Sequence, residues 1–372
     1  MTRPQKTIIA ILSVIAVSMV VIIGINAAQT YRAFASQPLG PVLPAQTLPP
    51  TWTASPAPSP VGQVTLAPTI SFATNTPAAK CGGPNVMNIL VIGADTRGDN
   101  YTYGLADAIR ILRVDFVTPK VTVLEFPRDL WVEIPHIADN LNGQDHEKLN
   151  QAFLYGQPGF KYWDDPSGGS GLLALTLNIN FGIKIDHYVT VNMRTFVNIV
   201  NAVGGVELNI PDRQTARNTG LPIGFHTLDG DQTLKVVRNR SGGAFERTNN
   251  QNMVVCALQK KLTSPMVVTQ IPKLIESFKD NIRTDFAPEQ LGQLACLGTQ
   301  MPLQNIAFAS FPQDIFKQGR VFDPVFNKRI YVLEADFGVL RDYSARFQNG
   351  TWPSTISTTT SSEEESTVSI CE

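Results

Sequence analysis

Three short apolar runs constrain the fold most strongly: NILVIGA at 88–94, IRILRVDF at 109–116 and VTVLEF at 121–126. Runs of this length that are rich in β-branched residues predict buried strands. GLLALTLNINFG at 171–182 has the pattern of a helix closed by glycine, and the strand-like HYVTVNM at 187–193 follows it. Strands that alternate with helices in this way predict an α/β sandwich.

The alternation continues to residue 262. RTFVNIVNAVGG at 194–205 places apolar residues at helical spacing before a glycine that can cap the helix. VELNI at 206–210 and LKVVRNR at 234–240 are expected as strands. TNNQNMVVCALQKKL at 248–262 is expected as a helix whose terminal lysines suit the helix dipole.

The amino-terminal segment predicts a membrane anchor. Arg3 and Lys6 precede an almost entirely apolar run at 7–28. About 20 such residues span a bilayer, and the preceding positive charges place the amino end in the cytoplasm. The alternative is a cleaved signal peptide, because Ala33-Phe34-Ala35 resembles a processing site. We favour the anchor, and both interpretations place the rest of the chain outside the cytoplasm.

Low-complexity segments mark the boundaries of the domain. The stretch between the anchor and Lys80 is dense in Pro, Thr and Ser and predicts an extended spacer. The final segment is rich in Ser, Thr and Glu and predicts a disordered tail. The expected organisation is 1–6 cytoplasmic, 7–28 transmembrane, 29–80 linker, 81–263 catalytic domain, 264–352 a C-terminal extension packed on that domain, and 353–372 a disordered tail.

The charge balance and the cysteines exclude some classes of function. The formal net charge of −1 gives no basic field for nucleic acid. The four cysteines form no Cys-x-x-Cys pair, so a zinc site is not expected. An oxidising location favours disulfides, and we favour a Cys256–Cys296 bond because both residues lie in helix-like apolar stretches. Two inert buried thiols are the alternative.

Charged residues follow or begin the predicted strands. Arg128 and Asp129 come directly after VTVLEF, where ligands of open α/β sheets bind. Guanidinium suits phosphate there because it can bind two oxygens at once. Asp95 follows NILVIGA, and Asp107 precedes the next strand. Two such carboxylates can hold a hard divalent cation, although an aspartate beside a glycine is also a common turn residue.

Further arginines suggest a larger anion site. If LKVVRNR is a strand, Arg238 and Arg240 share one face, where two like charges favour an anion between them. A solvated edge strand is the alternative. Arg247 lies near the start of the next predicted helix, with Gln251 one turn later. With Arg128, these residues could surround a pyrophosphate. Lys148 could line the same crevice or remain solvated.

These segments, in this order, resemble the LytR-CpsA-Psr family of bacterial cell-envelope proteins. The resemblance runs from about Asn88 to Leu262 and includes NILVIGADTR, VTVLEFPRDLWVEIP, LDGDQTLKVVRNR and FERTNNQ. It implies a three-layer α/β/α sandwich with a central mixed sheet and an apolar lipid pocket. It also implies a Mg²⁺-dependent phosphotransferase that moves a glycopolymer from an undecaprenyl-pyrophosphate carrier to peptidoglycan.

The resemblance also assigns roles. Two positions depart from the family pattern, because Leu105 and Asn250 stand where arginines are usual, and Arg97 or Arg110 could substitute for them. Asp129 would orient its neighbours or help to deprotonate the acceptor hydroxyl. The implied catalytic residues are Asp107, Arg128 and Asp129; the implied metal ligands are Asp95 and Asp107; the implied pyrophosphate ligands are Arg128, Arg238, Arg240, Arg247, Gln251 and Arg97.

Two other functions remain open from the sequence. The missing arginines favour a non-catalytic binder of polyprenyl-pyrophosphate lipids that regulates envelope assembly. Hydrolysis of the pyrophosphate without transfer is the third possibility. In every case the expected partners are a lipid-linked glycopolymer, peptidoglycan and the membrane, with no nucleic acid.

Overall fold

The structure of this chain is a computed structural model. It describes residues 29–47, 77–96, 101, 103–138, 143–239, 243–262, 281–324, 327–353 and 368–371.

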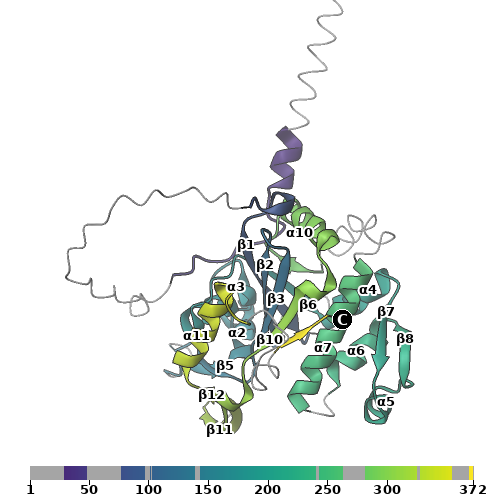
Figure 1. Cartoon of the computed structure of the whole chain (residues 1–372). Coiled ribbons are helices and arrows are strands. Elements are labelled where there is room, and N and C mark those ends of the chain that lie inside the picture. The colour runs from purple at the N-terminus through teal and green to yellow at the C-terminus, as the bar shows by residue number, and fades with distance from the viewer. Residues whose placement is uncertain are drawn as a thin grey trace, which may run out of the picture.

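A seven-stranded mixed sheet forms the centre of the molecule (Figure 1). In spatial order its strands are β13 (Val368–Ile370), β10 (Ile306–Ser310), β3 (Lys120–Glu125), β2 (Ala106–Asp115), β1 (Val86–Ala94), β6 (His187–Asn192) and β9 (Arg283–Thr284). β1 is parallel to β6 and β3 is parallel to β10, while β2 is antiparallel to both of its neighbours. The three apolar runs are therefore strands, as predicted, and the structure places them next to one another in the sheet.

Alternate residues of the strands face two separate apolar cores, because side chains of a strand point to opposite faces. Leu90 and Ile92 of β1 face the larger core, whereas Ile89 faces the other. Helices cover both faces, which confirms the predicted α/β architecture. The larger core is covered by α2 (Leu149–Tyr155), α3 (Gly168–Phe181) and α11 (Phe337–Gln348), and the opposite face by α10 (Pro288–Gln300) and α7 (Gly243–Leu262).

A smaller unit with its own core lies beside the sheet (Figure 1). Its buried residues include Val200, Val206, Val236 and Val254, the last of which belongs to α7. The unit comprises α4 (Met193–Ala202), the hairpin β7 (Val206–Ile210) and β8 (Gly224–Leu228), and the helices α5 (Arg213–Thr219) and α6 (Gly230–Arg238).

The prediction of a strand at LKVVRNR is wrong, because residues 230–238 form helix α6. Asp229 is its N-cap, and Gln232 completes a reciprocal capping box with it. These two residues satisfy backbone donors that are otherwise left without partners at a helix start. The Asp-x-x-Gln signature lies in the sequence just before the apolar run, and it outweighs the β propensity of the two valines.

A second hairpin covers the end of the sheet near Asp129. It consists of β11 (Phe316–Asp323) and β12 (Lys328–Ala335). It contacts the short pair β4 (Trp131–Glu133) and β5 (His146–Lys148): Leu333 donates its backbone N–H to the carbonyl of Asp129 at 2.8 Å. The described residues also include the short 3-10 turns η2 (Lys80–Gly82), η3 (Pro158–Phe160), η4 (Leu303–Asn305) and η5 (Gln313–Ile315).

Both expected low-complexity ends contribute to the fold. Residues 29–35 are helical, and the Gln46 side chain makes two hydrogen bonds of 2.9 Å with the backbone of Ile185. This part of the expected spacer therefore packs against the domain. At the other end, Val368–Ile370 adds strand β13 to the central sheet, which corrects the prediction of disorder for these residues. Residues 354–367 lie outside the described part of the chain.

The predicted Cys256–Cys296 bond is wrong. The structure pairs Cys81 with Cys296 and Cys256 with Cys371. Cys256 and Cys296 lie on two different helices, α7 and α10, and each helix meets a segment from an end of the domain. The segment 264–352 also contributes more than a covering layer, since β9 and β10 are strands of the central sheet.

The predicted anchor at 7–28 lies outside the described residues. Within the part of the chain that the structure describes, no helix combines the length and the apolarity that crossing a membrane requires.

Candidate functional site at the carboxyl edge of the sheet

Several polar side chains meet at one edge of the sheet because of the strand directions. β1, β3 and β10 run the same way, so their carboxyl ends lie together, and the antiparallel β2 begins at that edge. Asp95 follows β1, and Arg128 and Asp129 follow β3. Ligands of open α/β sheets bind in this position.

Asp107 occupies an irregularity in the sheet. Gly93 pairs with Ala108 and Ala94 pairs with Ala106, which leaves Asp107 as the extra residue of a bulge. A bulge changes the direction of a side chain relative to a regular strand. Asp107 is thereby brought to Arg128, with which it forms an ion pair.

Arg128 is the centre of a chain of charges. One nitrogen of its guanidinium binds Asp107, and Nε lies 3.3 Å from Oδ2 of Asp129. The other oxygen of Asp129 accepts a hydrogen bond from Nζ of Lys148 at 2.9 Å. Burial acts to lower the pKa of Arg128, but the charges of Asp107 and Asp129 outweigh burial and raise that pKa. The network therefore holds the guanidinium charged and oriented.

Asp107, Arg128 and Asp129 of this network line a cavity of about 430 Å³. Arg247 also lines it and donates a hydrogen bond to the backbone carbonyl of Asp107 at 2.9 Å. The lining also includes apolar side chains, among them Phe316 and Leu333 of the hairpin β11–β12. Such a cavity suits a ligand with an anionic head and an apolar body. Its lining consists of Asp107, Glu125, Phe126, Pro127, Arg128, Asp129, Arg247, Thr248, Ser310, Phe311, Gln313, Phe316, Gln318, Tyr331 and Leu333.

Helix α7 is fixed to the sheet beside this cavity. Glu125 of β3 accepts hydrogen bonds from Arg110 at 2.9 Å and from Thr248 at 3.1 Å. Arg110 also donates to Oε1 of Gln251 at 3.0 Å. Gln251 is therefore held by a buried arginine, and it is not among the residues that line the cavity.

The remaining predicted site residues fall in different places. Asp95 lies at the same edge, where Oδ1 accepts a hydrogen bond from the backbone of Leu105 at 2.7 Å. Arg238 is exposed at the end of α6, so the argument that it shares a strand face with Arg240 is wrong. Arg97 and Arg240 lie outside the described residues.

Three further residues belong to the site or its support. The sequence leaves open whether Lys148 lines the crevice or remains solvated. In the structure it binds Asp129. Glu125 and Thr248 line the cavity but were not predicted. A detectable signal existed for Glu125, because a charged residue ends an otherwise apolar strand opposite Arg110. Nothing in the local sequence indicates Thr248.

The sequence model of the LytR_cpsA_psr family matches residues 70–335. The chain therefore belongs to the LytR-CpsA-Psr family. The match continues past Leu262 and includes much of the segment expected as an extension.

Known proteins with similar sequences or structures agree with this family. The chain is 30% identical over 213 residues to the polyisoprenyl-teichoic acid–peptidoglycan teichoic acid transferase TagU of Oceanobacillus iheyensis. The matched region covers 56% of this chain and 62% of the relative. It thus spans less than two thirds of that relative.

Solved structures share the fold. Bacillus subtilis TagT superposes with a TM-score of 0.53 at 19% identity, covering 75% of this chain and 98% of that one. A structure of the family protein YwtF (TagT) with bound octaprenyl pyrophosphate lipid superposes with a TM-score of 0.51 at 20% identity, covering 72% of this chain and 90% of that one.

Proposed function

We propose that this chain is a phosphotransferase that attaches an anionic glycopolymer, carried on a polyprenyl pyrophosphate, to peptidoglycan. The observation that carries the proposal is the cavity at the carboxyl edge of the sheet, whose lining combines the cations Arg128 and Arg247 with apolar side chains such as Phe316 and Leu333. A pyrophosphate suits the cations and a prenyl chain suits the apolar part. The names of the related proteins point to the same class of substrate.

The proposed reaction replaces the phosphoanhydride bond of the pyrophosphate by a phosphodiester bond to the acceptor. The oxygen of an acceptor hydroxyl bonds to the phosphorus that carries the polymer, and the bridging P–O bond breaks to release polyprenyl phosphate. Asp129, held by Arg128 and Lys148, accepts the hydroxyl proton. Arg128 and Arg247 stabilise the negative charge on the phosphate oxygens, since phosphoryl transfer depends mainly on positioning and charge stabilisation.

Mg²⁺ is part of this proposal. No group of three or more potential ligands of the His, Cys, Asp or Glu type occurs among the described residues. Mg²⁺ usually takes only one or two protein carboxylates together with substrate phosphates, so Asp95 and Asp107 at the same edge fit it. When bound, the ion would neutralise charge on the pyrophosphate.

We also propose that the protein is a single-pass membrane protein with its domain outside the cytoplasm. The apolar run at 7–28 and its preceding positive charges support this topology. The two disulfides support it as well, since disulfides persist in oxidising compartments.

Transfer of radiolabelled polymer from a synthetic lipid pyrophosphate to peptidoglycan tests the function, with Mg²⁺ and with a chelator. Arg128→Ala should lower turnover by about 10²- to 10³-fold. Arg128→Lys should recover only part of it, because lysine keeps the charge without the guanidinium geometry. Arg217→Ala, at an exposed position of α5, is the matched control. Release of polyprenyl phosphate without labelled peptidoglycan would indicate hydrolysis instead, and lipid binding without release would indicate the regulatory binder that Leu105 and Asn250 favour.

A further inference from the structure

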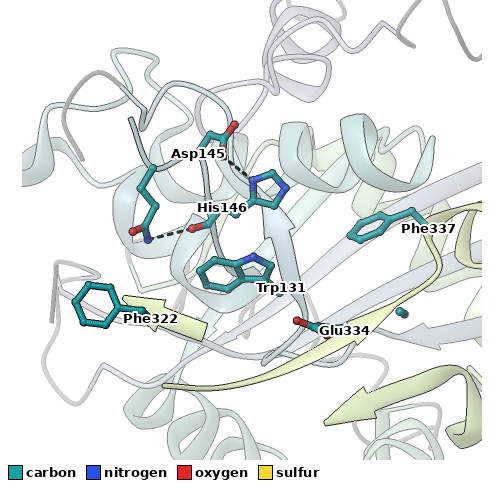
Figure 2. Close-up of a pocket in the computed structure, with 8 residues that line it drawn as sticks. Trp131, Asp145, His146, Phe322, Glu334 and Phe337 are labelled. Atoms are coloured by element: carbon teal, nitrogen blue, oxygen red, sulfur yellow. Dashed lines mark hydrogen bonds and ion pairs between the residues drawn. The ribbon is translucent and has the colours of Figure 1, made fainter. Parts of the chain in front are cut away.

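A second cavity of about 520 Å³ lies close to the candidate site along two segments of the chain. Trp131 follows Asp129 by two residues, and Glu334 directly follows Leu333 of the first cavity. The volume lies within the range of roughly 300–1,000 Å³ typical of ligand pockets. We call it the aromatic hollow (Figure 2), and its lining is Trp131, Gln144, Asp145, His146, Phe322, Glu334, Ala335 and Phe337.

Three separate elements supply aromatic rings to the hollow. Trp131 belongs to β4, Phe322 to β11 and Phe337 to the start of α11. In Figure 2, Trp131 lies between the other two rings. Phe322 is 58% exposed, so most of its ring is accessible to a ligand. Trp131 stacks on His146 and Phe337 stacks on Phe181, so the ring faces available to a ligand are those of Phe322 and the face of Trp131 away from His146.

The polar side chains of the hollow are the carboxylates Asp145 and Glu334 together with Gln144 and His146. Asp145 lies 2.6 Å from Nδ1 of His146, and the His146 ring stacks on Trp131 with 6.3 Å between centroids. Glu334 is exposed on β12, and its carboxylate points toward Trp131 in Figure 2. Aromatic faces beside carboxylates are complementary to sugars, whose C–H groups pack on rings and whose hydroxyls donate to carboxylates.

We propose that the aromatic hollow binds an uncharged saccharide chain, the glycan strand of the acceptor. The assignment to the acceptor, though not the saccharide site itself, rests on the proposed transferase function. The position of the hollow beside Asp129 suits an acceptor that presents one hydroxyl to the first cavity.

The charges and the spacing of the rings decide between ligand classes. Asp145 is paired with His146, whereas the exposed carboxylate of Glu334 repels phosphate groups, which disfavours the anionic glycopolymer at this place. An ammonium group would be bound by rings that converge around it. Among the described residues, no aromatic pair joins the three rings of the hollow to one another, and Trp131 lies between the other two (Figure 2), an arrangement that suits consecutive sugar units.

Calorimetric titration of the full chain in detergent with a β-1,4-linked N-acetylglucosamine tetrasaccharide tests the inference. We expect saturable binding that Phe322→Ala weakens by about fivefold or more, the loss of one aromatic contact. Phe225→Ala is the matched control, because Phe225 is 80% exposed on the separate hairpin β7–β8. Glu334→Gln should also weaken binding, and Trp131→Ala should weaken it most. Unfolding midpoints of all variants exclude a folding defect.

Several outcomes would overturn the inference. These are an absence of binding, equal affinities of Phe322→Ala and the wild type, or binding of choline or polyglycerol phosphate in place of the tetrasaccharide. The titration contains neither lipid nor Mg²⁺, so it is independent of the transfer assay. Binding without any transfer would refute the proposed function alone, and transfer without binding would refute this inference alone.

Discussion

Arg110 donates a hydrogen bond from Nη2 to Oε1 of Gln251 at 3.0 Å, and the same nitrogen binds Glu125 at 2.9 Å. Arg110 is only 6% exposed, so this contact is a buried attachment of helix α7 to strand β2. α7 also carries Arg247 and Thr248 into the lining of the first cavity. The placement of these two side chains thus depends on a polar contact one turn further along the helix.

Gln251→Leu should lower the free energy of unfolding by about 1–3 kcal/mol, because it removes an acceptor from a buried cation. Urea unfolding measures the change. Gln214→Leu, at an exposed position of α5, should change stability by less than about 0.5 kcal/mol. Equal stabilities of the wild type and Gln251→Leu would show that the contact does not attach the helix.

Lys148→Met should lower the turnover of the proposed reaction by between about 10- and 100-fold, because Asp129 loses one of the two groups that orient it. The change should appear in kcat more than in KM for the lipid substrate, and Lys148→Arg should restore most of the rate. Lys235→Met, at an exposed position of α6, is the control. A loss that Arg fails to restore, together with a lowered unfolding midpoint, would indicate a purely structural lysine.

Stability should fall between about pH 4.5 and about pH 7 because of Glu147. This residue is fully buried, and burial together with the charge of Asp323 raises the pKa of Glu147 to about 7 from an ordinary value of 4.5. Between these values the folded chain binds more protons than the unfolded chain, so stability decreases as pH rises and levels off above the folded pKa. The expected loss is about 3 kcal/mol.

Asp323→Asn should reduce this pH dependence, because it removes the second carboxylate of the pair. Urea unfolding at about pH 5 and about pH 8 measures it. Asp314→Asn, at an exposed position, should retain the full wild-type decrease. Wild-type stability that does not change across the range would contradict the raised pKa.

Mass spectrometry of peptides from the unreduced protein tests the disulfides. It should detect Cys81 joined to Cys296 and Cys256 joined to Cys371. A peptide that joins Cys256 to Cys296 would instead support the pairing expected from the sequence.

The sequence predicts the strands of the sheet well where a run is apolar enough by itself to indicate a buried strand. NILVIGA, IRILRVDF and VTVLEF are apolar enough to identify as central strands, and Arg128 and Asp129 follow from the end of the third. Helix α6 was missed because its valines suggest a strand, while its capping box determines the local structure. At residues 230–238, the valines thus favour a strand, whereas the capping residues favour a helix.

Other features depend on residues that are distant in sequence. The disulfide partners Cys81 and Cys296 are 215 residues apart, and no local pattern joins them. The position of Asp107 depends on a bulge, which requires the register with β1. Lys148 reaches Asp129 only because β4 and β5 pair. Such contacts depend on the tertiary fold. The sequence therefore identifies candidate residues but does not show which of them are in contact.

Strand β13 has a consequence for how copies of this protein meet. An uncovered edge strand presents free backbone groups that can recruit a strand from another molecule. Val368–Ile370 occupies that edge of β10, and the adjacent Cys371 is bonded covalently to Cys256 of α7. At the opposite edge, β9 contains only two residues and offers little backbone for pairing. Strand β13 thus covers the edge of β10 and leaves an outer strand of only three residues, so both edges of the sheet offer little backbone for pairing with a neighbouring copy.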